Sequence, residues 1–230
     1  MKPLNLSELM AWEPPRSVPI ISSGILYSGT KMILFGKYKS WKSMLAIHTG
    51  FCIATGSHWL GYRTTRRRVL IIQLEIPQAL FRNRLITYCK TYDSYPDNIY
   101  FVYEPYLKLD RGFGMATLEP VLATLQPDVV ILDPLYKALS GNISDSTTAE
   151  QFQTNIDRLS HKYNFSTIII AHTRQALITP EGGVIDMGAD ELMGSSNWPN
   201  WFDSVVRVTK VSESPEEVAL SISFEAMRHA

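Results

Sequence analysis

Short apolar runs alternate with stretches of helical periodicity along most of the chain. The apolar runs lie at residues 32–35, 69–74, 99–103, 129–132 and 167–171, and helical spacing lies between them at 42–55, 77–92, 115–125 and 147–163. Strands that helices cover on both faces need continuous apolar sequence, and their alternation with helices is typical of βαβ units. The pattern predicts an α/β fold with a mostly parallel central sheet flanked by helices.

The helical segments differ in the strength of their signals. One face of the clearest segment, 147–163, carries the apolar residues Phe152, Ile156, Leu159 and Tyr163. Thr147 and Glu150 have the spacing of a capping box at its start. The segment 115–125 is weaker, because Pro120 should interrupt the helix there.

The two ends of the chain have different patterns. Residues 1–30 mix scattered apolar side chains with Pro14, Pro15, Pro19 and Gly24. This mixture predicts an irregular arm lying on the domain, with regular structure beginning after it. Near the other end, 204–211 and 218–224 flank a polar turn and predict an antiparallel hairpin that closes the sheet edge. We therefore expect an N-terminal arm over 1–30 and one domain over 31–230.

Composition narrows the classes of protein. The chain has 230 residues, 45% hydrophobic and 19% charged, which suits one compact domain with a full core. Lysine plus arginine and aspartate plus glutamate each number 22, so no global field draws the protein to nucleic acid or to an anionic membrane. Any contact with DNA must be local. The start lacks the order of a signal peptide and no long apolar span occurs, which predicts a soluble, cytoplasmic protein.

The chain has two cysteines, Cys52 and Cys89. Both lie in apolar, helix-like segments, where a thiol usually serves as a small core residue. We expect structural burial, with a disulfide or a metal site as the alternative.

The segment ILFGKYKSWKSMLA has the pattern of a phosphate-binding loop between a strand and a helix. Loop amides and the helix N-terminus can bind phosphate oxygens, Lys42 can add a charge between the β- and γ-phosphates, and Ser43 can bind Mg²⁺. The residues expected to contact the nucleotide are Gly36, Lys37, Tyr38, Lys39, Ser40, Trp41, Lys42, Ser43 and Met44. The alternative is a basic turn whose lysines meet solvent.

One position departs from this pattern. Trp41 stands where the motif has its second glycine, a residue that permits close backbone approach and an unusual φ angle. A nucleotide can bind only if the tryptophan ring points away from the phosphates.

Two acidic residues and a histidine end other predicted strands. Asp133 follows the run VVIL and is expected on the Mg²⁺ side of the site, with a helix cap as the alternative. Glu75 ends the run at 69–74 and is expected to act as general base, again with a cap as the alternative. His172 follows the strand at 167–171 and is expected to report the γ-phosphate, although a histidine in this place is often structural.

With these elements in order, the chain resembles the RecA-like ATPases, and more closely the RepA-like group of replicative helicase ATPases of plasmids and phages. The resemblance covers roughly residues 20–228 and includes LIIQLEIPQALFRNRL, VVILDPLYKAL, IIIAHTRQ and MGSSNWPNWFDSVVRV. Gln175 departs from the family, which usually has a lysine at this place in its sensor motif. The resemblance implies ATP as nucleotide, Mg²⁺ as metal, the helicase-type strand order, and a homo-oligomeric ring, such as a hexamer, with active sites at the interfaces.

In such rings a basic residue of the neighbouring subunit reaches the γ-phosphate. Arg207 and Lys210 hold the matching place here, and the alternative is an exposed strand edge guarded by charge. The family's DNA-contacting loops match 140–150 and 175–194, but the second has four acidic residues and no lysine or arginine. The basic cluster at 62–68 could bind phosphate, although a solvated surface loop is the simpler interpretation.

Three functions fit these observations. The first is an ATPase motor of DNA replication or recombination that acts on single-stranded DNA. The second is a nucleotide-binding switch in which Trp41 suppresses hydrolysis and ATP drives assembly. The third is a filament-forming recombinase or loader, for which the short arm at 1–30 offers little.

Overall fold

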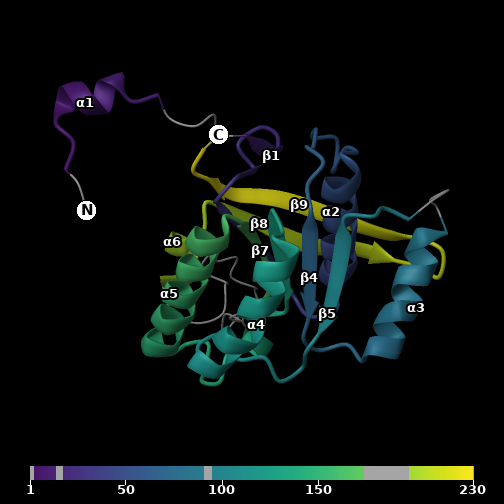
Figure 1. Cartoon of the computed structure of the whole chain (residues 1–230). Helices are drawn as coiled ribbons and strands as arrows, with labels where there is room; N and C mark the ends of the chain where they lie inside the picture. The colour runs from purple at the N-terminus through teal and green to yellow at the C-terminus, as the bar shows by residue number, and fades with distance from the viewer. Residues whose placement is uncertain (1–2, 14–17, 91–94, 174–196, 230) are drawn as a thin grey trace, which may run out of the picture.

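The structure, a computed structural model, describes residues 3–13, 18–90, 95–173 and 197–229 (Figure 1). Its strands are β1 Pro19–Ile21, β2 Leu26–Tyr27, β3 Lys31–Gly36, β4 Val69–Gln73, β5 Ile99–Tyr103, β6 Val129–Asp133, β7 Ser166–His172, β8 Ser204–Glu213 and β9 Val218–Met227. Its α-helices are α1 Leu6–Ala11, α2 Lys42–Thr55, α3 Gln78–Cys89, α4 Gly112–Leu125, α5 Ser146–Tyr163 and α6 Asn197–Trp201, and η1 Leu135–Ala138 is a 3₁₀ helix.

A seven-stranded sheet forms the centre of the fold, in the order β5-β4-β6-β7-β3-β8-β9. Neighbouring strands are parallel from β5 to β8, and β9 pairs with β8 as an antiparallel hairpin at the edge. The predicted fold class, a mostly parallel sheet with flanking helices and a C-terminal hairpin, is confirmed. The five apolar runs form five of these strands, and four of them, β3, β4, β6 and β7, are buried on both faces, whereas β5 is a partly exposed edge strand.

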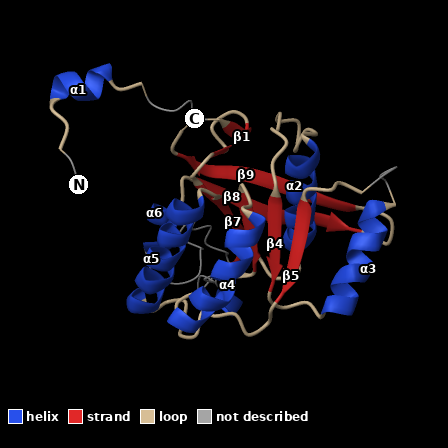
Figure 2. Ribbon diagram, viewed as in Figure 1, coloured by secondary structure: helices blue, strands red, loops and turns tan. Residues whose placement is uncertain are grey.

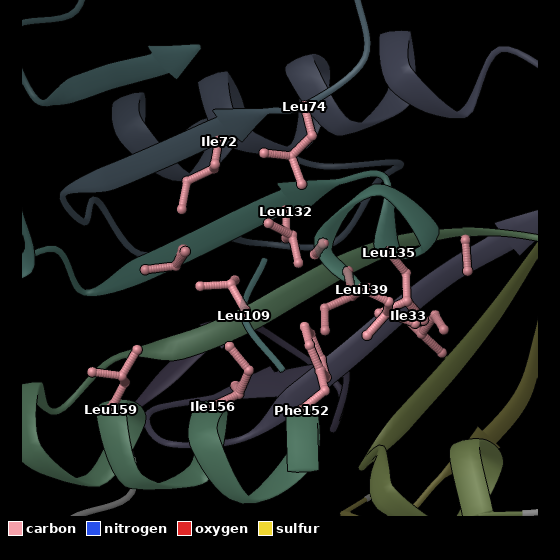
Figure 3. Packing of buried hydrophobic residues seen from close by; sticks show 14 of the residues in the cluster. Ile33, Ile72, Leu74, Leu109, Leu132, Leu135, Leu139, Phe152, Ile156 and Leu159 are labelled. Carbon is pink, nitrogen blue, oxygen red and sulfur yellow. The ribbon is translucent and has the colours of Figure 1, made fainter. Parts of the chain in front are cut away.

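Helices lie on both faces of the sheet (Figure 2), and two hydrophobic clusters, one on each face, make the core. Helices α4, α5 and α6 pack on one face, where Phe152, Ile156 and Leu159 of α5 point at strand residues such as Ile72 and Leu132 (Figure 3). Helix α2, Phe81 of α3 and the β1–β2 segment pack on the other face. Successive residues of the central strands β3, β4, β6 and β7 therefore alternate between the two clusters.

The carboxyl ends of four neighbouring strands meet at one edge of the sheet. Gly36 of β3 pairs with His172 of β7, and Gln73 of β4 pairs with Asp133 of β6. Ligands of open α/β sheets bind at this edge, because the strands end there and their loops diverge. The register thus brings residues far apart in sequence to the same place.

Two expectations about helices are wrong. Helix α4 runs unbroken through Pro120, because Met115 and Leu118 before it and Leu122 after it are buried and hold both halves to the sheet. Helix α5 begins one residue earlier than expected, so no capping box forms between Thr147 and Glu150. Instead, the Asp145 carboxylate accepts hydrogen bonds from the backbone N–H and the hydroxyl of Thr148, at 2.8 Å and 2.7 Å.

The N-terminal residues are more regular than the sequence suggests. They contain α1 and the antiparallel pair β1 and β2, so regular structure begins before residue 31. Ile20, Ile21, Ile25 and Leu26 are buried in the hydrophobic cluster that also contains the apolar residues of α2. Residues 18–30 therefore contribute side chains to the core, whereas no residue of α1 is buried. The boundary at residue 30 stays a prediction.

Both cysteines are free thiols in helices. Cys52 of α2 is buried, as expected of a core residue, and Cys89 of α3 is half-buried. Burial raises the pKa of both thiols, which keeps them protonated.

Candidate functional site

The loop between β3 and α2 is held by internal contacts. The Ser40 hydroxyl donates a 2.8 Å hydrogen bond to the carbonyl oxygen of Lys37. Gly36, where the loop leaves β3, lies so close to β8 that a Cβ atom would stand 2.1 Å from the carbonyl oxygen of Val208. Glycine is thus required here for strand packing. The side chains of Lys37, Tyr38 and Lys39 are exposed.

Lys42, at the first position of α2, points into this loop. Its Nζ donates hydrogen bonds to the Lys37 carbonyl oxygen at 2.6 Å and to the Ser40 hydroxyl at 3.1 Å. The residue is only 4% exposed, so the alternative of a lysine that meets solvent does not hold for it. Burial lowers the pKa of Lys42 to about 8, although the nearby carboxylates of Asp133 and Glu75 act in the opposite direction.

Trp41 adopts the backbone conformation that the missing glycine would have provided. Its φ and ψ angles of 60° and 18° lie in the left-handed region, which costs a residue with a side chain about 1–2 kcal/mol. The indole Nε1 donates a 3.3 Å hydrogen bond to Oε1 of Glu213, at the end of β8. This hydrogen bond directs the Trp41 ring toward β8. The side chain that enters the loop is that of the next residue, Lys42.

Asp133 lies at the end of β6, buried beside the start of α2. Its carboxylate accepts hydrogen bonds from the side chains of Ser43 and Gln73, and the Gln73 Nε2 lies at 3.1 Å. Burial nevertheless raises the pKa of Asp133, since these contacts only partly replace water. The helix-cap alternative does not describe this residue, because the carboxylate contacts side chains of β4 and α2 instead of the first turn of η1.

Glu75 follows β4 and reaches the same edge of the sheet. Gln73 shapes its turn, because the side-chain oxygen of Gln73 accepts hydrogen bonds from the backbone N–H groups of Glu75 and Ile76 at 2.9 Å and 3.1 Å. The Glu75 carboxylate accepts a 2.7 Å hydrogen bond from the hydroxyl of Tyr136 in η1. Helix α3 begins beyond Glu75, with Pro77 at its N-cap position and no side-chain cap. The cap alternative for Glu75 is therefore wrong.

His172, at the end of β7, lies between two tyrosine rings. Tyr38 of the loop and Tyr136 of η1 have their ring centroids 5.6 Å and 5.7 Å from it. Its buried Nδ1 finds no hydrogen-bond partner among the described residues. Burial, and then the charge of Lys42, lower the pKa of His172, so the ring is neutral at physiological pH. Arg174 and Gln175 of the same motif lie outside the described residues.

These side chains border one cleft of about 820 Å³. From the predicted set it is lined by Tyr38, Lys39, Ser40, Trp41, Lys42, Ser43, Met44, Glu75, Asp133 and His172. Gly36 and Lys37 of the predicted set do not line the cleft. The structure thus brings together the residues that the sequence assigned to a nucleotide, a metal and the general base.

The sequence interpretation did not include one wall of the cleft. Helix α3 contributes Leu80, Asn83, Arg84 and Thr87. Their spacing places them on one side of the helix, which is a signal that was available in the sequence. Tyr136, the partner of Glu75, was also missed.

Arg207 and Lys210 of β8 have different surroundings. The Arg207 guanidinium lies 3.1 Å from the carboxylate of Glu225 on β9, and its side chain is 13% exposed. Lys210 lines the cleft of its own chain beside Glu213, with which it forms an ion pair. The structure does not place either residue at a neighbour's site, so that role stays a prediction.

The basic cluster at 62–68 lies at the other edge of the sheet, before β4. Arg66 forms a 2.7 Å ion pair with Asp97, and Arg68 donates a 2.7 Å hydrogen bond to the carbonyl oxygen of Leu125. Because two of its cations have partners within the chain, the cluster resembles the solvated surface loop of the simpler interpretation. The loop at 175–194 falls within residues that the structure does not describe.

A lysine-bearing loop between a central strand and its helix, together with acidic residues on neighbouring strands, is the arrangement by which P-loop ATPases bind and cleave a nucleoside triphosphate. The fold and this cleft define the protein as a member of that class. The chain matches the model of the AAA domain family over residues 2–176 and belongs to that family. The match ends before β8, so Arg207 and Lys210 lie outside it. No curated protein matches the chain.

The described residues contain no helix that is both long and apolar enough to cross a membrane.

Proposed function

We propose that the protein is a Mg²⁺-dependent ATPase motor of the RecA-like, RepA-related type, which acts on single-stranded DNA in replication or recombination in the cytoplasm. The observation that carries the proposal is the convergence of Lys42, Ser43, Asp133 and Glu75 in one cleft at the carboxyl edge of a parallel sheet. Binding and hydrolysis of a triphosphate need these groups: a cation, metal-binding oxygens and a base.

Lys42 would bind the phosphates. Its ammonium group is already held inside the loop by the Lys37 carbonyl and the Ser40 hydroxyl, so little side-chain entropy remains to be lost on binding. The N-terminus of the 14-residue helix α2 lies beside it and favours negative charge. Together they select an anionic ligand for this end of the cleft.

Ser43 and Asp133 fit a magnesium ion. The buried Asp133 carboxylate and the Ser43 hydroxyl are in hydrogen-bond contact, and hard oxygen donors of this kind are what Mg²⁺ prefers. A bound Mg²⁺ would supply charge neutralisation at the phosphate oxygens. The charge of a bound Mg²⁺ would also lower the pKa of Asp133, which burial raises.

Glu75 would remove the proton from the attacking water. Its side chain lines the cleft and acts on the charges of Lys42 and Asp133, so the carboxylate lies close to the site where the γ-phosphate must be. His172 would contact the γ-phosphate from β7, as a neutral ring able to donate one hydrogen bond.

The ring assembly gives Arg207 its role, a contact with the γ-phosphate of the neighbouring subunit. To make this contact the guanidinium must break its ion pair with Glu225 and bind the phosphate instead. The two variants Lys42→Ala and Arg207→Ala test it. Each should be inactive alone, and their mixture should regain turnover, because some interfaces then combine an intact loop with an intact arginine. A mixture that forms oligomers by mass measurement but regains no activity would refute the role in trans.

The DNA partner is tested by measuring ATP turnover with and without single-stranded oligonucleotides, with Glu75→Gln as the inactive control. We expect DNA to raise kcat. The loop at 140–150 has no lysine or arginine, so its contribution would come from backbone amides and hydroxyls and would change little with salt. Turnover that no DNA affects would remove the helicase assignment and leave the ATPase.

The second candidate function is a nucleotide-binding switch with weak or no hydrolysis. The left-handed Trp41 favours it, since a strained residue beside the phosphates can hold the loop in a poorly reactive geometry. Tight ATP binding without phosphate release, together with gain of turnover in Trp41→Gly, would support the switch over the motor.

A further inference from the structure

Glu75 and Tyr136 follow two neighbouring strands, and their side chains are in contact where Glu75 lines the cleft. Glu75 follows β4 and Tyr136 lies in η1, directly after β6, and these two strands pair in parallel with Gln73 opposite Asp133. The Tyr136 hydroxyl donates a 2.7 Å hydrogen bond to Oε1 of Glu75. Within the described part of the chain, no other side chain hydrogen-bonds this carboxylate.

Tyr136 is itself held in place. Its ring lies 5.7 Å from the His172 ring, and the ammonium group of Lys137 lies 5.5 Å from its centroid. Burial, and then the hydrogen bond to Glu75, raise the pKa of Tyr136, so the phenol stays protonated and donates at every physiological pH. The tyrosine is thus a fixed donor.

Glu75 lacks such support of its own. Its backbone N–H is bonded to Gln73, but its carboxylate is exposed, and a glutamate side chain in solvent has several rotamers of similar energy. One hydrogen bond from a fixed donor selects the rotamer that points into the cleft. It occupies Oε1 and leaves Oε2 to accept a proton from water.

We propose that Tyr136 is a positioning residue, which orients the Glu75 carboxylate for removal of a proton from the attacking water. The inference rests on the proposed hydrolysis and adds a residue to it. Removing a hydrogen-bond partner that orients a functional side chain typically changes activity by about 10- to 100-fold. Tyr136 acts through Glu75 and makes no contact with the nucleotide in this role.

The test is the kinetics of Tyr136→Phe, which loses the hydroxyl and keeps the ring against His172. We expect kcat to fall about tenfold while KM and the dissociation constant for ATP stay unchanged, since the loop that binds the phosphates is untouched. The matched control is Tyr106→Phe, because Tyr106 is 81% exposed and does not line the cleft. Its kcat should equal that of the wild type.

A double-mutant cycle shows whether the effect passes through Glu75. Glu75→Gln should lower kcat at least about 100-fold, and adding Tyr136→Phe should then cause no further loss. An equal tenfold loss in both backgrounds would overturn the inference, as would a wild-type kcat in Tyr136→Phe or an effect on KM alone. Absence of turnover in the wild type would refute the proposed function and the inference with it.

Discussion

The ammonium nitrogen of Lys42 lies 2.6 Å from the carbonyl oxygen of Lys37, five residues earlier in the same loop. Through this contact the phosphate-binding loop binds the ammonium group of its own lysine. It explains how a lysine can be buried next to Ser40 and Asp133, whereas burial itself lowers the pKa of the ammonium group to about 8. A triphosphate that enters the cleft must replace the carbonyl as the partner of Lys42.

The first prediction is a dependence of ATP affinity on pH. Burial lowers the pKa of Lys42 to about 8 in the nucleotide-free protein, and phosphates bind the charged form. The charged fraction should fall from about 0.9 at pH 7 to about 0.1 at pH 9, so ATP should bind about tenfold more weakly at pH 9. Calorimetric titrations at the two pH values measure this. Lys39→Ala, at an exposed lysine of the same loop, should keep the profile. Equal affinity at both pH values would contradict nucleotide binding by a Lys42 whose pKa is lowered.

The second prediction concerns Trp41. Replacing it by glycine removes a left-handed strain of about 1–2 kcal/mol and the exposed hydrogen bond to Glu213, worth about 1 kcal/mol. The free energy of unfolding should therefore change by less than about 1 kcal/mol in urea denaturation. If the protein is a motor, kcat should stay within about threefold of the wild type, a change below 1 kcal/mol. Glu213→Gln, which keeps an acceptor for the indole, serves as control. A large gain in turnover for Trp41→Gly alone would favour the switch.

The third prediction separates two glycines. A Cβ on Gly36 would stand 2.1 Å from the Val208 carbonyl oxygen, so Gly36→Ala must push β3 and β8 apart, whereas no atom lies within 4 Å of a Cβ on Gly112. Gly36→Ala should lower the free energy of unfolding by about 1–3 kcal/mol. Gly112→Ala should change it by less than about 0.5 kcal/mol. Urea titrations compare the two, and similar stability of both variants would contradict the packing described for β3 and β8.

Much of the sheet could be predicted from the sequence, because strands buried on both faces require continuous apolar runs. The run at 129–132, for example, lies within β6, and the rule that ligands bind at the carboxyl edge of a parallel sheet places Asp133 and Glu75 in one cleft, as the structure has them. Local sequence sufficed for these residues, since Asp133 is the last residue of β6 and Glu75 lies two residues after β4.

Other features depend on contacts that a single segment does not encode. The α3 wall of the cleft was missed because the helical spacing of its residues does not tell which loop that side of the helix faces. The hydrogen bond between Tyr136 and Glu75 likewise depends on the pairing of β4 with β6. Ile20 and Ile21 of β1 are buried in one of the two core clusters, where prolines suggested an irregular arm. Tertiary packing likewise carried α4 through Pro120.

The central claim is that the loop from Gly36 to Ser43 binds a nucleoside triphosphate through Lys42, and calorimetric titration of the purified protein with ATP and Mg²⁺ tests it most directly. We predict saturable binding by the wild type and loss of binding in Lys42→Ala. The fold of this variant should persist, which cooperative thermal unfolding would show. Equal ATP affinity of the wild type and Lys42→Ala, or no binding of any nucleoside triphosphate by the wild type, would contradict the account.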